Sequence, residues 1–418
     1  MGRQAPTPPS THERASGAER AGPGHRGRGH TAVTAAMVAD RGRRLVRGAT
    51  VPVLALFSAL VVGGVVIILS DSDALRAWSS FVADPGGALS ASWDVVRDAY
   101  VALFRGSLGG RRPISETLLE ATPLILTGLS VTFAFRAGLF NIGGDGQFLA
   151  GALASVYVSF VLDVPILVHL PLALLAGVAA GAMWGGIAGA LKARTGAHEV
   201  ITTIMLNFIA LRLVDYALST DVFRRTGRND PISKQVRDTA RLPRFTDDLR
   251  VHLGLLIALA AAYAVWWVLF RSTVGFRVRA VGASPTASRY AGMAVGGTWV
   301  LAMLVAGGLA GLAGATTVLG VRFSLTGGFS YLGFDAIALA LLGRSHPAGV
   351  VGAALLFGVL RAGATSMQAE TSTPVDIIVV IQALVIVFIA APSLIRAVYR
   401  IRASRATGPV AFSSSWGS

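Results

Sequence analysis

The chain has 418 residues, of which 53% are hydrophobic and 14% are charged. Soluble domains carry about 25% charged residues, so this composition excludes an ordinary soluble protein and favours a polytopic membrane protein. Because the chain has no cysteine, a disulfide framework, a thiolate metal site and a cysteine nucleophile are excluded. The net charge of +15 resides in tails and loops, where the positive-inside bias places basic residues, and does not indicate a nucleic-acid partner.

The N-terminal residues 1–48 are rich in Gly, Pro, Ser, Thr and Arg and poor in large apolar side chains. Such a segment cannot bury enough surface to offset its ordering entropy, so we predict a disordered, basic cytoplasmic tail. Arginines at its end precede the first apolar run, residues 51–69, and place the N-terminus inside the cell. A transmembrane domain is predicted over 49–395, and a second cytoplasmic tail over 396–418.

The rest of the chain alternates between apolar runs and polar connections. Residues 71–116 form a predicted outer segment with an interfacial helix, because aromatic side chains alternate there with charges. Residues 219–250 form a polar outer loop. The runs indicate an all-α membrane protein of about ten transmembrane helices with both termini in the cytoplasm. After the first run, the predicted spans are 117–135, 145–162, 170–191, 199–218, 252–270, 298–320, 333–343, 347–367 and 374–394.

The stretch FNIGGDGQFLA, residues 140–150, lies between two apolar runs and is unusually polar. A carboxylate in hydrocarbon costs about 2.5 to 3.5 kcal/mol, and exposed backbone groups add to this cost. We therefore interpret the stretch as a broken or re-entrant helix on a solute pathway, with Phe140, Asn141, Asp145 and Gln147 as candidate pathway residues. A short cytoplasmic turn before a transmembrane helix is an equally good reading of the composition.

Two later segments add polar pathway candidates. Glu199 and Asn207 lie in the run 199–218, although Glu199 can equally serve as a favourable charge at the helix N-terminus. Asp335 follows Gly327, Gly328 and Gly333, as Asp145 follows the glycines of the first stretch. Because spans 2–5 and 7–10 repeat this order from opposite sides, we predict inverted repeats, whose glycine-interrupted segments mark the solute path.

Residues 271–297 form the longest internal loop, and arginines place it in the cytoplasm. Ser284 and Pro285 predict the start of a short helix, which Gly292 ends. A short capped helix on the inner face suits docking to another protein, whereas a plain connector needs neither start nor stop signal. The two lysines, Lys192 and Lys234, are not part of a phosphate-binding GxxxxGK[ST] loop. ATP, if it drives this protein, must therefore bind another chain.

Several runs of sequence resemble one family of transport proteins. The permease subunits of bacterial ABC importers of the nucleoside and simple-sugar class are similar to this chain over roughly residues 95–395. The likeness is greatest to the nucleoside branch, which is related to ribose permeases. His198 departs from the pattern, since Asn is expected before Glu-Val, and the role of this side chain stays open. The matching runs are 121–152, 198–216, 275–293, 309–315 and 333–364.

The resemblance implies a cell-membrane importer subunit for nucleosides or related ribosides, driven by ATP hydrolysis on a separate chain. It implies three partners: a cytoplasmic ATP-binding subunit, a second and usually different permease, and an extracytoplasmic substrate-binding lipoprotein. No catalytic residue, metal site or cofactor is expected. Aromatic and polar pathway residues would suit base stacking and ribose hydroxyls. The implied ATPase-coupling residues are Arg279, Gly282, Ser284, Pro285, Ala287, Tyr290 and Gly292.

Other functions fit parts of the sequence. A ribose-type sugar permease and an amino-acid permease of a neighbouring family use the same architecture. An ion-coupled secondary transporter is compatible with intramembrane carboxylates, but it has no role for a capped internal loop. A membrane enzyme fits worst, because no nucleophile–base or metal-ligand spacing is present.

Overall fold

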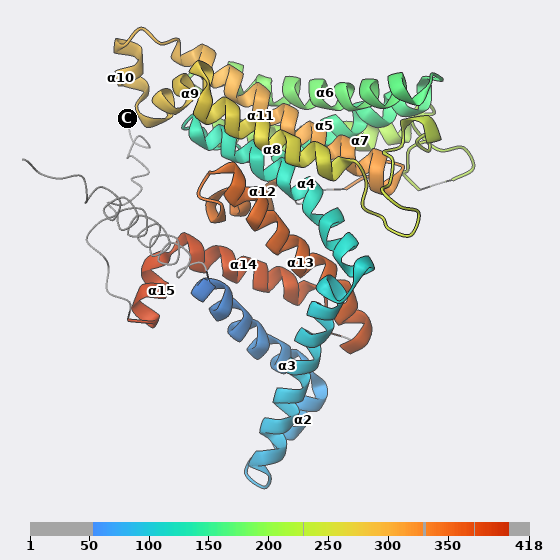
Figure 1. Ribbon diagram of the computed structural model, residues 1–418, viewed down its shortest axis with the longest axis vertical. Helices are drawn as coiled ribbons and strands as arrows, with labels where there is room; N and C mark the ends of the chain where they lie inside the picture. Colours follow the sequence, from blue (N-terminus) through green and yellow to red (C-terminus); the bar gives the residue numbers. More distant parts are fainter. Residues whose placement is uncertain (1–52, 229, 329–331, 372, 401–418) are drawn as a thin grey trace, which may run out of the picture. The chain divides into compact units, whose positions relative to one another are not determined.

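The computed structural model describes residues 53–400 except 229, 329–331 and 372. The predicted N-terminal tail and the chain beyond residue 400 lie outside the described residues. Within the described part, regular secondary structure is helical, and pairing between extended segments is limited to isolated bridges (Figure 1). The predicted all-α class is thereby confirmed for this part of the chain.

Seven described helices are long and apolar enough to cross a membrane. Of the other predicted spans, α5 (Gly144–Val161) has the length but is more polar, while α12 (Leu332–Leu342) and α14 (Asp376–Ala390) are shorter. At about 1.5 Å per residue, the 11 residues of α12 cover roughly half of a 30 Å hydrocarbon core. The seven are Val53–Ser70, α4 (Arg111–Arg136), α6 (Ile166–Thr195), α7 (Glu199–Ser219), α8 (Gly254–Arg271), α11 (Val295–Thr317, extended by the π-helical turn η2, Val318–Arg322) and α13 (Pro347–Thr371).

The predicted outer segment 71–116 contains two helices, α2 (Ser72–Ser79) and α3 (Pro85–Leu108). The sequence predicts an interfacial helix here, and the structure adds that α3 lies against α13. Leu103 is fully buried, and a Cβ added to Gly363 of α13 would lie 2.3 Å from the Leu103 carbonyl oxygen. The aromatic side chains Trp93 and Phe104 point outward from the same helix. Helix α3 is thus part of the helical bundle.

Small residues allow the central helices to approach closely. Figure 1 shows α11 running beside α6 and α5. At the crossing of α6 and α11, a Cβ on Gly181 would lie 2.4 Å from the Gly307 carbonyl oxygen, and one on Gly311 would lie 2.3 Å from that of Gly177. Only glycine allows such backbone contact, and small-residue faces are typical of helix packing in membranes. The close-packing faces predicted for these two spans are observed here.

The polar loop before α8 is anchored to the segment that follows η2. Ser233 N–H donates to the Leu325 carbonyl and Val236 N–H to the Phe323 carbonyl, both at 2.9 Å. The Arg241 guanidinium lies over the Phe323 ring at 4.7 Å. These bonds satisfy backbone groups that would otherwise be unpaired beside the helices.

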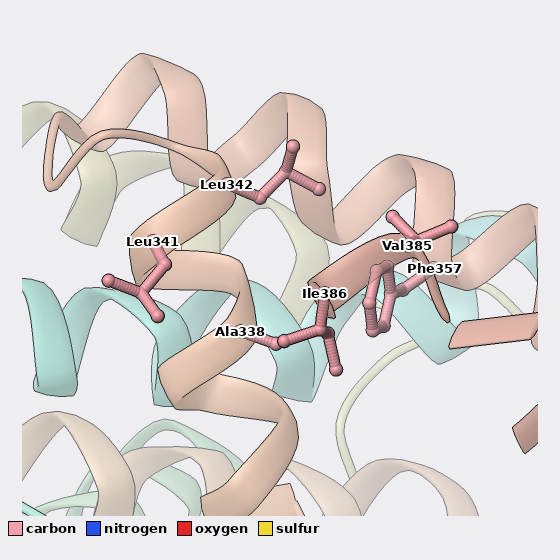
Figure 2. Close-up of a pocket in the computed structure, with 6 residues that line it drawn as sticks. All are labelled: Ala338, Leu341, Leu342, Phe357, Val385 and Ile386. Atoms are coloured by element: carbon pink, nitrogen blue, oxygen red, sulfur yellow. The ribbon is translucent and has the colours of Figure 1, made fainter. Parts of the chain in front are cut away.

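The C-terminal helices meet around an apolar pocket (Figure 2). Helix α14 is followed by α15 (Pro392–Val398), and α14 packs on α12 and α13. Because the pocket offers no polar side chain, it does not suit a polar solute. Its lining is Ala338, Leu341, Leu342, Phe357, Val385 and Ile386.

Candidate functional site

A polar break between two helices is present where the sequence places it, as both the broken helix and the short turn predict. Helix α4 ends at Arg136 and α5 begins at Gly144, with a loop between them that we call the first joint, residues 137–147. The Asn141 and Gln147 side chains are fully buried and form two mutual amide hydrogen bonds of 3.0 Å. Asn141 Oδ1 also accepts from the Gly143 N–H at 3.1 Å. The Asn141 and Gln147 amides therefore satisfy each other inside the first joint.

Asn207 of α7 ties this joint to a neighbouring helix. Its Oδ1 accepts from the Gly146 N–H at 2.8 Å, and its Nδ2 donates to the Ile142 carbonyl at 2.9 Å. The Asn207 side chain is buried, and a Cβ on Gly146 would lie 2.9 Å from its Oδ1. The glycine therefore lets α7 approach closely enough to satisfy an N–H that has no partner within α5.

Asp145 joins the first joint to the segment that leads into α12, which we call the second joint, residues 324–335. Asp145 Oδ1 accepts from the Gly333 N–H at 3.0 Å, and a Cβ on Gly144 would lie 3.0 Å from the Gly333 Cα. Asp335, two residues further on, forms a largely buried ion pair with Arg361 of α13. The two glycine-rich segments that the sequence predicts at matching positions thus touch each other.

Phe140 lies at the edge of the first joint. Its ring is half-buried and stands 5.0 Å from the ring of Phe135, at an angle of 37°. Of the predicted pathway residues, the structure brings Asn141, Asp145, Gln147 and Asn207 into one network. A pathway role for these residues stays a prediction, because their bonds in this conformation go to other protein atoms.

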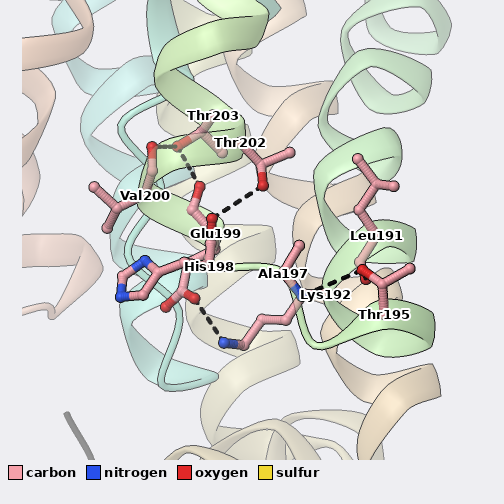
Figure 3. Close-up of polar contacts among 9 residues, drawn as sticks. All are labelled: Leu191, Lys192, Thr195, Ala197, His198, Glu199, Val200, Thr202 and Thr203. Carbon is pink, nitrogen blue, oxygen red and sulfur yellow. Dashed lines mark hydrogen bonds and ion pairs between the residues drawn. The ribbon is translucent and has the colours of Figure 1, made fainter. Parts of the chain in front are cut away.

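Glu199 lies apart from that network, at the first residue of α7 (Figure 3). Its carboxylate pairs with Lys192 Nζ, near the end of α6, at 2.6 Å, and its backbone carbonyl accepts from the Thr203 hydroxyl. Lys192 also lies 5.1 Å from the Trp299 ring centre. These contacts favour the structural interpretation of Glu199 as a charge at a helix N-terminus.

The predicted short helix in the loop 271–297 is confirmed as α10 (Pro285–Tyr290). Ser284 Oγ accepts from the Ala287 N–H at 3.2 Å, Pro285 occupies the first turn, and Gly292 has a φ of 77°. Tyr290 is 90% exposed, so the helix presents a large aromatic side chain outward. The prediction missed the preceding helix, α9 (Thr273–Ala283), which the Ser272 hydroxyl caps.

Helix α9 carries two coupling candidates to the first joint. A Cβ on Gly282 would lie 2.3 Å from the Arg136 carbonyl oxygen, and one on Gly138 would lie 3.1 Å from the Gly282 Cα. Arg279 and Arg136 both lie 5.3 Å from the Phe270 ring centre. Helix α9, which directly precedes α10, therefore contacts the start of the first joint backbone to backbone.

His346 completes this cluster at the turn between α12 and α13. Its ring stands 5.3 Å from Phe270, and Arg136 Nε donates to the neighbouring Ser345 carbonyl at 2.8 Å. Burial, and then the positive charge of Arg136, lower the pKa of His346. The imidazole therefore stays neutral where two guanidinium groups already lie close together.

Several of these contacts escape sequence reasoning. Arg361 and Lys192 carry the countercharges of Asp335 and Glu199, and nothing in the sequence pairs either of them with its carboxylate. Gly138 has a φ of 73°, a left-handed conformation that favours glycine. A glycine directly after the apolar run could therefore have predicted the turn at this position.

Membrane-crossing helices packed through small residues, with a polar glycine-rich break between two of them, are typical of multi-pass transport permeases. Residues 114–390 match the family described as the branched-chain amino acid transport system / permease component, and the chain belongs to this family. It is accordingly a transporter subunit of the plasma membrane and not an enzyme.

Curated relatives refine this assignment. The chain is 45% identical to the guanosine ABC transporter permease protein NupP of Bacillus subtilis, over 72% of this chain and 87% of NupP. It is 38% identical to the nucleoside ABC transporter permease protein NupB of Lactococcus lactis, over 74% and 88% of the two chains. The glucose ABC transporter permease protein TsgB13 of Haloferax volcanii is 36% identical, over 81% and 86%. No solved structure is significantly similar.

Proposed function

We propose that this chain is the permease subunit of an ABC importer that takes up nucleosides or related ribosides. The observation that carries the proposal is its 45% identity to a guanosine permease along nearly all of that protein. A cytoplasmic ATP-binding subunit supplies the energy, an extracytoplasmic lipoprotein delivers the solute, and a second permease chain completes the pore.

Reconstituted uptake tests this function. Proteoliposomes that contain the chain with its three partners should accumulate labelled guanosine or uridine when ATP is supplied to the ATP-binding subunit. A protonophore should leave this uptake unchanged. Uptake that the chain performs alone, without nucleotide hydrolysis, would contradict the proposal.

A sugar is the second candidate cargo, because a glucose permease is 36% identical to this chain. Competition between labelled and unlabelled solutes distinguishes a nucleoside cargo from a sugar cargo. If the cargo is a nucleoside, excess guanosine should suppress labelled uridine uptake while excess free ribose or glucose should not. Suppression of uridine uptake by free ribose or glucose at comparable concentrations would favour a sugar as the cargo.

We further propose ten membrane crossings with inverted repeats and both chain ends in the cytoplasm. The contacts between helices support this arrangement, since α4, α5, α6 and α7 would correspond in order to α11, α12, α13 and α14. Helix α11 packs on α6 and α5 as α4 packs on α13 and α12, and the contacts of α5 with α6 and α7 match those of α12 with α13 and α14. Epitope tags at either end should be accessible only after the cells are permeabilised.

The first joint is proposed to open toward the solute during transport. Its amide bonds support this role, because neutral hydrogen bonds can exchange protein partners for solute hydroxyls without leaving a charge unpaired. Asn141, Asn207 or Asp335 replaced singly by Ala should each reduce uptake. Wild-type uptake with normal expression in all three variants would remove the pathway role.

Helix α10 is proposed to dock on the ATP-binding subunit. Its exposed Tyr290 and Ala287, and the contact of Gly282 with the first joint, support this function. The variants Tyr290→Ala and Ala287→Arg should lose co-purification with the ATP-binding subunit. Tyr263→Ala, an exposed tyrosine on α8, is the matched control. Retained co-purification in both α10 variants would refute docking there.

A further inference from the structure

Positive charge gathers around a single aromatic ring at the end of α8. We call this group the arginine cluster. It consists of Phe270 and of three basic side chains that come from the end of α4, from α9 and from the turn between α12 and α13. Both guanidinium carbons, and the centre of the imidazole ring, lie 5.3 Å from the centre of the Phe270 ring. The basic side chains are Arg136, Arg279 and His346.

The protein does not neutralise either arginine of the cluster. Arg136 donates through its Nε to the Ser345 carbonyl at 2.8 Å, and Arg279 donates through its Nε to the Gly275 carbonyl at 3.4 Å. Among the residues that the structure describes, the Nη groups of these two side chains have no hydrogen-bond partner and no carboxylate forms an ion pair with them. Both guanidinium groups therefore keep donors that can bind the oxygen atoms of an anion.

Other half-buried cations of the chain have a countercharge. Lys192, Arg241 and Arg361 each pair with a carboxylate. In the arginine cluster, by contrast, the two guanidinium charges repel each other. Like charges that are partly removed from water are unfavourable without a counter-ion, so an anion that reaches both groups gains Coulomb energy that no side chain of the protein supplies.

An apolar stripe on the outer surface of α8 leads to the cluster. Its exposed side chains follow one another at intervals of three and four residues, which places them on one face of the helix, and Phe270 comes three residues after the last of them. Exposed Tyr and Trp side chains near the end of a membrane-crossing helix are typical of the headgroup level. The stripe consists of Leu256, Leu259, Tyr263 and Trp267.

We propose that the arginine cluster binds a phosphate group, and that this phosphate belongs to the headgroup of an anionic lipid. The planar guanidinium fork matches the oxygen atoms of a phosphate, and basic pockets between helix ends suit anionic headgroups. The acyl chains then lie along the apolar stripe of α8. The lipid occupies the inner leaflet in the proposed topology, and its binding does not depend on which solute is carried.

The bound phosphate connects two moving parts of the chain. Arg136 is the last residue of α4, where the first joint begins, and Arg279 lies three residues before Gly282, which contacts that joint. A phosphate between the two arginines cancels their repulsion across this contact. Anionic lipid should therefore hold α9, and α10 beyond it, against the first joint and increase ATP-driven uptake.

Native mass spectrometry of the assembled importer tests the binding. The importer is purified in detergent, stripped of lipid and mixed with phosphatidylglycerol, phosphatidylcholine or inorganic phosphate. The double variant Arg136→Gln with Arg279→Gln should retain one phosphatidylglycerol fewer per copy of this chain than the wild type. The matched control, Arg194→Gln with Arg277→Gln, removes two exposed arginines and should retain the wild-type number.

The probes separate a lipid from a soluble anion. Phosphatidylcholine, which has the phosphate but no net charge, should not replace phosphatidylglycerol at the same concentration, and neither should inorganic phosphate. Wild-type retention of phosphatidylglycerol by the double variant would overturn the proposal. Displacement by inorganic phosphate at equal concentration would make the cluster a site for a soluble anion and would overturn the lipid assignment.

Thermal unfolding provides a second measurement within each variant. Phosphatidylglycerol should raise the Tm of the wild type and of the control, and should leave the Tm of the double variant unchanged. Because each Tm is compared with and without lipid, a lower starting stability of the double variant does not hide the result. An equal rise in all three proteins would place the stabilising lipid elsewhere and contradict the proposal.

A carboxylate of the ATP-binding subunit is the competing partner for the two arginines. If lipid is the partner, the double variant should still co-purify with that subunit. A double variant that keeps its phosphatidylglycerol and loses the subunit would show that the arginines bind protein, which overturns the proposal.

Uptake separates this proposal from the proposed function. ATP-driven guanosine uptake by the wild type should be faster in proteoliposomes that contain phosphatidylglycerol than in phosphatidylcholine alone, and the double variant should not distinguish the two. Lipid retention without guanosine uptake in either membrane would keep the site and reject the function. Guanosine uptake by an importer that retains no phosphatidylglycerol at the cluster would keep the function and reject the site.

Discussion

The two glycine-rich joints occupy matching positions in the chain but are held by different chemistry. Within the first joint, the neutral amides of Asn141, Gln147 and Asn207 bond to one another and to the backbone, while the Asp145 carboxylate accepts from the Gly333 N–H of the second joint. The second joint relies on charge. Asp335 lies in the first turn of α12 and is paired with Arg361 on α13.

This difference teaches how each joint can move. Amide hydrogen bonds are worth about 1 kcal/mol each and exchange easily for others, so the first joint can rearrange in small steps. A buried ion pair must keep its partner, because an unpaired charge is strongly disfavoured. We therefore expect the ion pair between α12 and α13 to act as the rigid support, and the amides of the first joint to be the part that rearranges.

The largest effect should come from breaking the ion pair. Arg361→Met leaves Asp335 buried without its countercharge and should lower the free energy of unfolding by about 3 kcal/mol or more. The double variant Asp335→Leu with Arg361→Met removes both charges and should recover most of this loss. Thermal denaturation in detergent measures both. A single variant as stable as the wild type would remove the contrast between the joints.

A smaller effect is expected at the first joint. Asn207→Ala leaves the Gly146 N–H and the Ile142 carbonyl without the asparagine partner and should cost about 2 to 3 kcal/mol. Thr202→Ala on the same helix is the control, since its hydroxyl bonds only to the His198 carbonyl among the described contacts. The same thermal assay should place the control within about 0.5 kcal/mol of wild type. Equal losses in the two variants would argue against a specific role for Asn207.

Acid should weaken the support of the second joint before that of the first. The buried His252 ring packs against Gly320 of η2, which leads into the second joint. Burial, and then the charge of Arg244, lower the pKa of His252 from 6.5 to about 4. Because the folded state has the lower pKa, its stability is complete above pH 6.5 and is lost as the pH falls toward 4, by about 2 kcal/mol at pH 5.

Hydrogen exchange can locate this loss. When amide exchange rates at pH 5 are corrected for the intrinsic rates, the protection of backbone amides should fall more in residues 318–328 than in residues 137–147. His252→Gln cannot titrate and should abolish the pH dependence between 6.5 and 5. A pH dependence that persists in this variant would assign the effect to another group.

The smallest effect concerns the contact between α9 and the first joint. Gly138→Ala forces a side chain into a left-handed conformation and against Gly282, and should cost about 1 to 2 kcal/mol from the conformation alone. Gly227→Ala is the control. Gly227 has a similar φ of 77°, but an added Cβ would meet no described atom within 4 Å, so this variant measures the conformational cost alone. Only Gly138→Ala should also reduce ATP-driven uptake. Equal uptake in both variants would show that the contact does not transmit the motion.

Local sequence was sufficient for much of the fold. The apolar runs predicted the long helices, the glycines at 143–146 predicted the break before α5, and Ser284, Pro285 and Gly292 predicted α10 and both its ends. These signals are strong because they depend on residues a few positions apart, where helix geometry and capping alone determine the outcome. The sequence did not predict that one face of α3 packs on α13, because the aromatic side chains that marked this helix lie on its other face.

The candidate site depended on contacts between residues far apart in the chain. Asn207 bonds to Gly146 across 61 residues, Asp145 accepts from Gly333 across 188, and Arg361 and not another arginine pairs with Asp335. No short-range pattern specifies such partners, because they are chosen by how the helices cross. Helix α7 shows the same dependence on packing. The sequence gives its polar residues, but only the packing determines that Asn207 faces the first joint and Arg212 faces outward.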